Sequence, residues 1–561
     1  MISRYNNDSR VFVIALDGAT FDVIKPWMQA GNLPNLQSLV QSGVHGDLES
    51  TYPPLTGPAW GSFMTGKTPV NHGVLEFFRR APYGYNQVLN SRQDVDGRSI
   101  WRVLSDAGKK VGVLGVPLIY PPEAVNGFLV TGLLTPRQPD VTFTYPPELG
   151  AELNEKLGGY LLQHTEKYLQ DDPTHLIREE HAILGNLVDA VLYLMRNKPW
   201  DFFIMHILGT DVLQHGFWHY MDPTHPEYES KLGDRYGNPI FDFWKQVDKK
   251  LGDVLDQLSP DVYVMVMSDH GFGPVVKYIN FNVWLLRTGF LQLKRDAWSR
   301  LRYLAFRLGY NYATAFKIGS RMGIVRQVIK LGRGKQESVQ RKMFLSLDDV
   351  DWSRTQVYSM GNFGQMYVNL KGREPQGCVS PGDEYERVLQ RLEDELRAMR
   401  DPETNETVIA EIWRGPELFK GKYADRAPDL FFFTRGMKYK AMGLTDFGSN
   451  KVFDDLYGTH AHHRMNGLFI LRGPGVRQGE RIEGARLVDL APTIYTLMGV
   501  PIPQDLDGQV LCQVFAPGYE IIPYYESSPV AHIVRPDVEQ VYSPEEEAAV
   551  AEQLRNLGYV D

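Results

Sequence analysis

The sequence predicts an α/β protein in which helices flank both faces of a central, mostly parallel β-sheet. Short apolar runs without polar interruption recur along the chain, and such runs are typical of parallel strands buried on both sides. Helix-like segments precede some of these runs, and alternation of helices with strands favours a parallel sheet. The clearest runs cover residues 11–16, 110–115, 201–206 and 262–267.

Two of these runs show the local pattern. Residues 11–16 are all apolar, and the Asp17-Gly18 pair that follows them is a turn signal. Residues 201–206 come after a helix-like segment at residues 182–195. Because ligands bind at the carboxyl ends of the strands in sheets of this kind, polar residues that follow the runs are candidate site residues.

The composition limits the class of protein. A length of 561 residues fits several domains or one large α/β domain with insertions. With 43% hydrophobic and 23% charged residues, the chain can bury a large core and global disorder is excluded. The formal net charge of -9 argues against a general nucleic-acid-binding protein, so we expect no stable complex with nucleic acid.

The sequence predicts a cytoplasmic protein. No apolar stretch reaches the length of a transmembrane helix, and the run at residues 11–16 is too short for a signal peptide. Cys378 and Cys512 are too few for a disulfide framework, which fits a reducing compartment. We expect two separate thiols that are buried or half-buried. The sequence does not indicate an oligomeric state.

We expect a catalytic core made of residues 1–290 and 343–520. Residues 291–342 are rich in Lys and Arg with apolar residues at helical spacing, which predicts a basic helical cap inserted into the core. The basic residues fit either a solvated face or a patch for an anionic substrate or for peripheral contact with a membrane. Residues 521–561 form an acidic C-terminal tail with a helix at residues 544–557, which we expect to pack on the surface.

Four groups of residues carry the carboxylates and imidazoles that bind divalent metal ions. Asp211 and His215 are four residues apart and would share one face of a helix. Asp269 and His270 are neighbours at the end of a predicted strand, where two adjacent side chains can reach two ions that lie roughly 3.5–4 Å apart. The groups are Asp17, then Asp211 with His215, then Asp269 with His270, and finally a loop with His460, His462 and His463. Spacing to the following strand favours His463 as the last ligand, with His460 as the alternative.

Thr56 lies in a loop that is stiffened by Pro53, Pro54 and Pro58. If residues 57–65 form a helix, Thr56 is its N-cap. A hydroxyl at this position lies beside free backbone N–H groups and the positive end of the helix dipole, which both favour a phosphate. A metal ion on the hydroxyl oxygen would lower its pKa and create a nucleophile. The sequence therefore predicts a two-metal hydrolytic site.

This order of residues resembles the alkaline phosphatase superfamily, and within it the type I phosphodiesterase/nucleotide pyrophosphatase branch. The resemblance spans most of residues 11–515 and skips the basic insertion. The motifs that carry it are Asp17-Gly18, Leu33-Pro-Asn-Leu36, Gly43, Pro53-Pro-Leu-Thr56, Pro58-Ala-Trp60, Thr65-Gly66, Pro69, His72-Gly73, Asp211 to His215, Ser268-Asp269-His270-Gly271 and residues 467–475.

The resemblance implies two divalent ions, zinc in most members and manganese in some. It implies attack by the Thr56 oxygen on phosphorus and a covalent phospho-threonine that is then hydrolysed. The implied ligands are Asp211, His215 and His463 for one ion, and Asp17, Asp269, His270 and the Thr56 oxygen for the other. The chain departs from the eukaryotic members, which have a Lys beside the nucleophile and an Asn shortly after it, because Leu55 and Gly57 flank Thr56 here.

The predicted protein is a metal-dependent hydrolase of small-molecule phosphate esters, with phosphodiesters or nucleotide pyrophosphate-type bonds as the favoured substrates. A phosphomonoesterase, phosphonate hydrolase or sulfate-ester hydrolase on the same fold is the alternative, because no residue identifies the second ester group. A non-catalytic, metal-stabilised binding protein is an alternative of another class. The intact Thr56 argues against it, since a structural metal site needs no nucleophile.

Overall fold

The structure of this protein is a computed structural model. It describes residues 9–81, 84–138, 140–162, 174–228, 236–311, 314, 343–443, 447–456, 458–519, 523–527 and 541–559.

A nine-stranded β-sheet forms the centre of the molecule. The four predicted strands are confirmed, and their ends differ from the predicted ends by one residue or none. In spatial order the strands are β20 (Ala485–Arg486), β2 (Val44–Glu49), β19 (Asn466–Arg472), β9 (Tyr263–Met267), β1 (Val11–Leu16), β8 (Phe202–Ile207), β5 (Val111–Leu114), β6 (Gly127–Val130) and β7 (Thr144–Tyr145).

The middle of this sheet is parallel. β1 pairs in parallel with β8 and β9, and β5 pairs in parallel with β8 and β6. The antiparallel strands are β19, which pairs with β9 and β2, and β7 at the far edge. The sheet is therefore mostly parallel, as the sequence predicts, and the carboxyl ends of its central strands lie along one edge.

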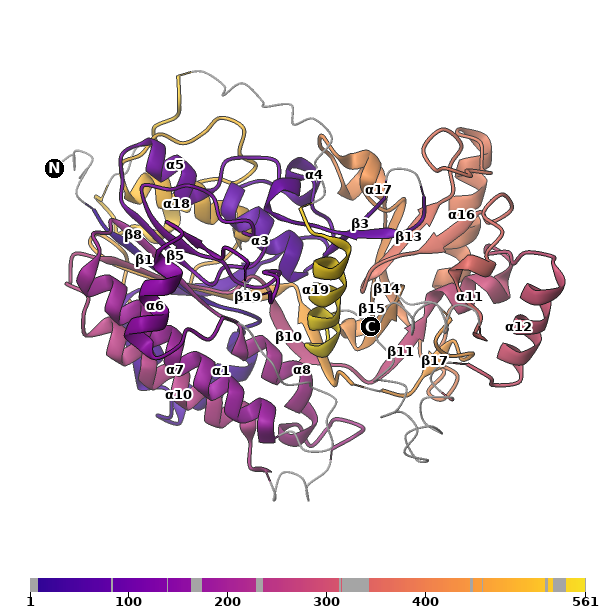
Figure 1. The fold of residues 1–561 in the computed structure, drawn as a ribbon, viewed down its shortest axis with the longest axis horizontal. Helices are drawn as coiled ribbons and strands as arrows, with labels where there is room; N and C mark the ends of the chain where they lie inside the picture. The colour runs from indigo at the N-terminus through magenta and orange to yellow at the C-terminus, as the bar shows by residue number, and fades with distance from the viewer. Residues whose placement is uncertain are drawn as a thin grey trace.

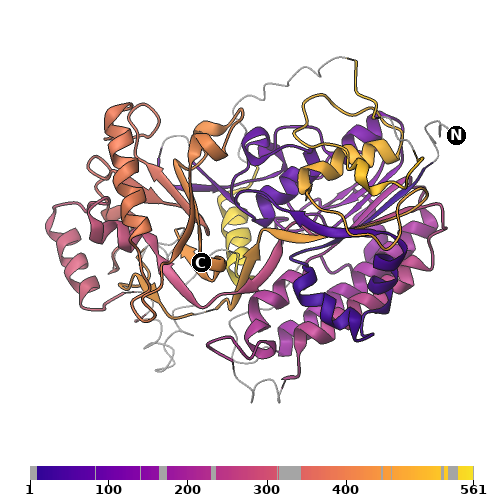
Figure 2. The same ribbon diagram turned by 180° about the vertical axis from the view of Figure 1, so that it is seen from behind.

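Helices flank the sheet on both faces, as Figure 1 and the reverse view in Figure 2 show. The predicted helix at residues 182–195 is confirmed and extends to Thr174–Asn197 in α7. One face carries α1 (Phe21–Gln29), α6 (Leu149–Leu157), α7, α8 (Gly209–Met221) and α10 (Pro239–Leu255). The other face carries α3 (Thr56–Thr65), α4 (Pro69–His72), α5 (Ile100–Asp106) and α18 (Leu490–Leu497).

A second hydrophobic core lies beside the first and includes buried residues from Ile279 to Phe447. Its four-stranded antiparallel sheet has the order β12 (Val357–Ser359), β13 (Gly364–Val368), β15 (Leu430–Thr434) and β14 (Ile409–Arg414). The helices α11 (Phe281–Thr288), α12 (Ala297–Arg307) and α16 (Asp383–Arg397) accompany it, as do strands β11 (Lys277–Asn280), β16 (Tyr439–Met442) and β17 (Phe453–Asp454). A short antiparallel pair consists of β10 (Gly271–Pro274) and β18 (Ala461–Arg464). In the sequence, each of these strands lies between a strand of the nine-stranded sheet and a strand that accompanies the second core.

The predicted basic insertion falls only partly on described residues. Its first helix is α12, and residues 312–313 and 315–342 lie outside the described part of the chain. The division into core, insertion and tail stays a prediction.

The predicted C-terminal helix is present, and it buries one face in the core while the other stays exposed. The helix is α19 (Pro544–Asn556), and Val550, Leu554 and Leu557 belong to the main hydrophobic core. In both views α19 lies between the nine-stranded and four-stranded sheets (Figures 1 and 2). The burial of these three residues is not evident from the sequence, because the helix is acidic on its exposed face and has few apolar residues.

Both cysteines are free thiols, and Cys512 is exposed rather than buried or half-buried. Among the described residues, no helix is both long enough and apolar enough to span a bilayer.

We predict that Leu554→Ala destabilises the protein by about 2–5 kcal/mol, because Leu554 is fully buried and truncation leaves a cavity. Chemical denaturation measures the free energy of unfolding. Glu545→Gln, on the exposed first turn of the same helix, is the matched control and should change this energy by no more than about 0.5 kcal/mol. A similarly small effect of Leu554→Ala would show that α19 is peripheral.

Candidate active site

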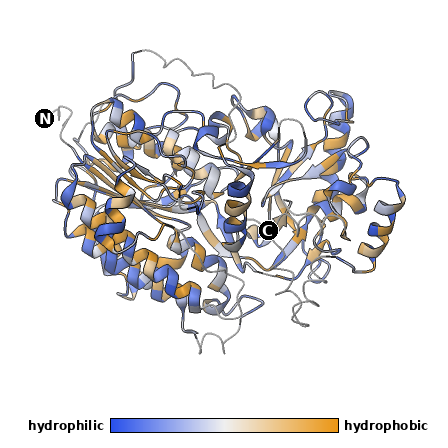
Figure 3. Cartoon of the chain, in the orientation of Figure 1, coloured by the Kyte–Doolittle hydropathy of each residue, from blue (hydrophilic) through white to orange (hydrophobic). Residues whose placement is uncertain are grey.

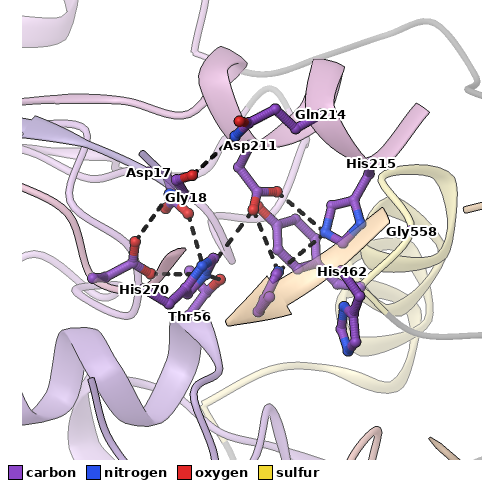
Figure 4. Close-up of polar contacts among 12 residues, drawn as sticks. Asp17, Gly18, Thr56, Asp211, Gln214, His215, His270, His462 and Gly558 are labelled. Carbon is purple, nitrogen blue, oxygen red and sulfur yellow. Dashed lines mark hydrogen bonds and ion pairs between the residues drawn. The ribbon is translucent and has the colours of Figure 1, made fainter. Parts of the chain in front are cut away.

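The seven predicted site residues come together at the carboxyl edge of the parallel strands, and all are fully buried. Figure 4 shows several of them facing a common centre. Asp17 follows β1, Asp211 and His215 lie in the first two turns of α8 after β8, Asp269 and His270 follow β9, Thr56 begins α3, and His463 lies in β18.

Thr56 is the first residue of α3, and its hydroxyl faces the cluster. Leu55 is the N-cap, so the prediction that Thr56 caps the helix is wrong. The physical reason is that the Thr56 hydroxyl is directed at His270, with Oγ1 3.2 Å from Nε2, instead of at the backbone N–H groups of its own helix. The hydroxyl is therefore available to the centre and still lies at a helix N-terminus.

His215 and His463 present the lone pairs of their Nε2 atoms to each other. Nδ1 of His215 donates to the backbone oxygen of Ala461 at 2.9 Å, and Nδ1 of His463 donates to that of Pro54 at 3.1 Å. In a neutral imidazole with Nδ1 protonated, Nε2 carries no proton. The two Nε2 atoms lie 3.1 Å apart, and Asp211 oxygens lie 3.4 Å from His215 Nε2 and 3.3 Å from His463 Nε2. A cation between these atoms removes the repulsion of their lone pairs.

His270 repeats this arrangement on the other side of the centre. Its Nδ1 donates to the backbone oxygen of Gly271 at 3.1 Å, which leaves Nε2 unprotonated. Nε2 faces Asp269 Oδ2 at 3.1 Å and Asp17 Oδ1 at 3.5 Å, in addition to the Thr56 hydroxyl. Backbone carbonyls that fix the imidazole tautomer in this way are typical of histidines that ligate metal ions.

The carboxylates of this centre have no cation to balance them. Asp17 Oδ1, Asp269 Oδ2 and both oxygens of Asp211 are buried without a hydrogen-bond partner. Burial first, and then the charge of Asp211, raise the pKa of Asp17 well above its usual value. Burial and the charges of Asp17 and Asp211 likewise raise the pKa of Asp269. Orphaned oxygens in a buried acidic cluster fit divalent metal ions, whose charge would stabilise the ionised carboxylates.

The histidines are suited to the same role because burial keeps them neutral. Burial lowers the pKa of His215 and of His463 to about 3, and it lowers the pKa of His270 well below its usual value. Only the neutral imidazole offers a lone pair to a metal ion. Three groups have ligand atoms within 4.8 Å of one another, namely Asp17, Asp269 and His270, then Asp211, His270 and His463, and then His215, His462 and His463.

Two residues that the sequence analysis missed hold Asp17 in place. His206 Nε2 lies 2.8 Å from Asp17 Oδ2, with its Nδ1 donating to the backbone oxygen of Gly115 at 3.0 Å. Trp60 Nε1 donates to the same Asp17 oxygen at 3.3 Å. The left-handed turn at Gly18, with φ +64°, lets its N–H donate to Asp269 Oδ1 at 3.2 Å. His206 could have been found by its position in a buried strand that ends at the same sheet edge.

The histidine-rich loop is divided by the structure. His463 lies in the centre, whereas His460 lies outside it and is bonded to Glu227 Oε2 at 2.8 Å. His462 was not assigned a role from the sequence, yet it is buried beside His463 and His215, with ring centroids at 4.6 and 5.7 Å.

A cavity of about 740 Å³ lies near the centre but does not include it. Phe272, whose ring packs edge-on against His215, lines the cavity together with Tyr52, Trp218 and Arg464. None of the seven site residues lines it.

The sequence of the chain matches the family of type I phosphodiesterases and nucleotide pyrophosphatases over residues 11–444. The chain belongs to this family, which lies in the alkaline phosphatase superfamily, and it is a phosphoester hydrolase. No curated protein sequence matches the chain significantly.

Solved structures of related fold agree. Phosphonoacetate hydrolase from Sinorhizobium meliloti 1021, in complex with phosphonoformate, superposes with a TM-score of 0.53 at 14% identity and covers 89% of this chain and 98% of its own. The human ectonucleotide pyrophosphatase/phosphodiesterase 5 has a TM-score of 0.49 at 12% identity, with 89% and 97% covered. The first similarity supports the alkaline-phosphatase-like α/β fold predicted from the sequence.

We predict that His463→Ala lowers the bound metal content, whereas His460→Ala does not. His463 offers a free Nε2 to the centre, and His460 is held by Glu227. Elemental analysis of the two purified variants beside the wild type measures the difference. Loss of metal from His460→Ala alone would reverse the assignment.

Proposed function

We propose that the protein cleaves phosphodiesters or nucleotide pyrophosphate-type bonds with two divalent metal ions, and that Thr56 is the nucleophile. One observation carries the proposal, which is the Thr56 hydroxyl at the N-terminus of α3, 3.2 Å from His270 Nε2 and facing a buried group of carboxylates and imidazoles. A purely structural metal site needs no such hydroxyl.

Two sets of donors would hold the ions. One ion would be held by Asp211, His215 and His463, which contact one another at 3.1–3.4 Å. The other would be held by Asp17, Asp269, His270 and the Thr56 oxygen. The mixed nitrogen and oxygen ligands suit zinc, with manganese as the alternative. When bound, these ions would lower the pKa of the Thr56 hydroxyl and neutralise charge on the phosphoryl oxygens.

The residues of the chain then act in a two-step displacement. Oγ1 of Thr56 forms a bond to phosphorus, the bond from phosphorus to the leaving oxygen breaks, and the proton of the Thr56 hydroxyl is taken up by the leaving oxygen. In the second step water attacks phosphorus, the bond to Oγ1 breaks, and a proton from that water restores the Thr56 hydroxyl. His206 and Trp60 keep Asp17 oriented throughout.

Burial of the centre contributes to the reaction in its own right. Thr56, Asp17 and His270 are fully buried, so electrostatic interactions with a phosphoryl group are stronger here than in water. The N-terminus of α3 adds the positive end of its dipole at the position of the attacked phosphorus.

Phosphonate hydrolysis is the second candidate. It is favoured by the fold shared with phosphonoacetate hydrolase and by the neighbours of Thr56, because Leu55 and Gly57 do not reproduce the Lys and Asn of the nucleotide-cleaving eukaryotic members. An assay panel of bis-p-nitrophenyl phosphate, p-nitrophenyl phosphate, phosphonoacetate and nitrophenyl sulfate separates these activities. The highest kcat/KM on the diester supports the first candidate.

We predict that Thr56→Ala keeps the fold and the metal content but lowers kcat at least about 10³-fold, because the covalent step has no nucleophile. The measurement is turnover of the best substrate of the panel, with elemental analysis of the same sample. Thr65→Ala is the matched control, since Thr65 is at the other end of α3 and its hydroxyl donates to Gly61. A Thr56→Ala variant with kcat within tenfold of the wild type would exclude the covalent mechanism.

A further inference from the structure

The last described residues of the chain lie inside the candidate active site. The segment reaches it because α19 is anchored on both sides: the backbone N–H of Leu89 donates to Glu547 Oε1 at 2.8 Å, and the Tyr542 hydroxyl donates to the backbone oxygen of Leu134 at 3.0 Å. Leu557 is buried in the main core. The chain from α19 to Tyr559 is therefore a packed part of the fold.

Gly558 turns the chain into the centre. Its φ of +82° is left-handed, and a Cβ there would come within 2.5 Å of Thr459 Cγ2 and 3.7 Å of His215 Cγ. Its carbonyl accepts from Lys440 Nζ at 3.4 Å, and the carbonyl of Tyr559 accepts from Asn362 Nδ2. Backbone contacts on both residues thus fix the position of Tyr559. Gly558 appears beside His215 in Figure 4.

The Tyr559 side chain is fully buried against the proposed ligands. Its ring packs edge-on against His215 at 5.5 Å, His463 at 6.0 Å and Phe77 at 5.4 Å between centroids. Its hydroxyl forms no hydrogen bond of normal geometry and lies next to the Asp211 carboxylate.

Other side-chain donors next to Asp17 are already used. Trp60 donates to the Asp17 carboxylate, and His206 Nδ1 donates to the Gly115 backbone oxygen at 3.0 Å. Thr210 donates to the Asp17 backbone oxygen at 2.6 Å, and Gln214 donates to that of Gly18 at 2.9 Å. An uncommitted hydroxyl in a buried site is costly unless a ligand completes its hydrogen bonds. A phosphoryl oxygen is an acceptor of the required kind.

We propose that Tyr559 is a catalytic residue whose hydroxyl donates a hydrogen bond to a phosphoryl oxygen of the bound substrate. This inference rests on the proposed function. Leu55 and Gly57 flank the proposed nucleophile and carry no polar side chain. In this proposal the C-terminal segment supplies a hydrogen-bond donor to the site. The donation requires no change in the protonation of the phenol.

The test is Tyr559→Phe, which keeps the ring and its packing and removes only the hydroxyl. Removal of one donor to a transition-state oxygen typically lowers kcat about 10²–10³-fold. We expect a fall in this range, together with an affinity of the holoenzyme for orthovanadate that is at least about tenfold weaker, because vanadate mimics the transferring phosphoryl group. Metal content and thermal unfolding should match the wild type. Tyr495→Phe, a fully buried tyrosine in α18 outside the site, is the control and should change neither quantity.

Two outcomes separate this inference from the proposed function. If Thr56→Ala abolishes turnover while Tyr559→Phe keeps wild-type kcat and vanadate affinity, the role of Tyr559 is refuted and the proposed function stands. If wild-type protein turns over no phosphoester, the proposed function fails, and vanadate binding to wild type and Tyr559→Phe still decides the hydrogen bond. Equal vanadate affinities overturn it.

A separate observation concerns α12, which lies at the end of the molecule far from the nine-stranded sheet (Figure 1). One face of the helix is anchored: the Ser299 hydroxyl donates to Asp349 Oδ1 at 2.7 Å, Arg302 pairs with the same carboxylate, and Phe306 packs edge-on against Phe447. This face holds the helix on the second core.

The opposite face of α12 exposes large apolar side chains in a stripe. Trp298 is 69% exposed, Leu301 and Leu304 are each 55% exposed, and Leu308, just after the helix, is 81% exposed. Exposed cationic side chains flank the stripe, and these are Lys294, Arg295, Arg300 and Arg307. Figure 3 shows apolar and hydrophilic residues alternating along this helix.

We infer that this face of α12 binds the surface of an anionic phospholipid membrane. An apolar stripe that includes Trp and Leu and is bordered by Arg and Lys is typical of helices that lie in the membrane interface. The basic border complements the negative charge of the lipid headgroups. This inference is independent of the catalytic proposals and gives the predicted membrane contact of residues 291–342 a defined surface.

Co-sedimentation with vesicles tests the surface. We expect the wild type to bind vesicles of phosphatidylserine and phosphatidylcholine at least about fivefold better than vesicles of phosphatidylcholine alone, with weaker binding at high salt. The combined change Leu301→Ser, Leu304→Ser and Leu308→Ser should abolish binding, and Leu161→Ser, an exposed leucine elsewhere, should not.

Arg300→Gln with Arg307→Gln keeps the apolar stripe and should weaken binding to the anionic vesicles only. Absence of wild-type binding overturns the inference. It is also overturned if the three serine changes leave binding intact, or if they convert a wild-type dimer into monomers, because a second copy would then be the occupant of this face.

Discussion

The rest of the structure depends on three carboxylates that are buried together without a balancing charge inside the protein. Asp17, Asp211 and Asp269 are fully inaccessible, and four of their oxygens have no hydrogen-bond partner. Such a group is strongly unfavourable unless cations fill it. The same burial lowers the pKa of the surrounding histidines and keeps their imidazoles neutral. Burial therefore disfavours the ionised carboxylates without cations and also makes the histidines good metal ligands.

A parallel sheet brings the three carboxylates together at one of its edges. The strands that precede the three aspartates are adjacent, with β1 between β8 and β9, so residues that are far apart in sequence arrive at one edge. Backbone carbonyls of Ala461, Pro54 and Gly271 then fix the tautomers of the histidines. The orientation of these three histidines is therefore set mostly by main-chain atoms, which substitutions of single side chains do not remove.

The additions to this sheet account for what is particular to this chain within its family. Next to Thr56, the residues Leu55 and Gly57 offer no polar side chain to the substrate. A helix from the far end of the sequence enters the centre instead and brings Tyr559 into contact with two histidines. The second hydrophobic core carries α12 with its exposed apolar face. Family membership defines the chemistry as phosphoester hydrolysis, and Tyr559 and α12 are the parts that we propose to contact the substrate and a membrane.

Sequence by itself determined the class of fold and the strands and pointed to Thr56 as the candidate nucleophile, because apolar runs followed by Asp and a proline-bounded Thr are local signals. It also favoured His463 over His460, since the distance to the next strand is a local property. Only the tertiary structure decided that Thr56 starts its helix without capping it, since the nearby His270 competes for its hydroxyl. The contact of Tyr559 with the site likewise could not be predicted from the sequence, because no local pattern around a tyrosine after an acidic helix indicates it. The contact arises from long-range packing against residues hundreds of positions away.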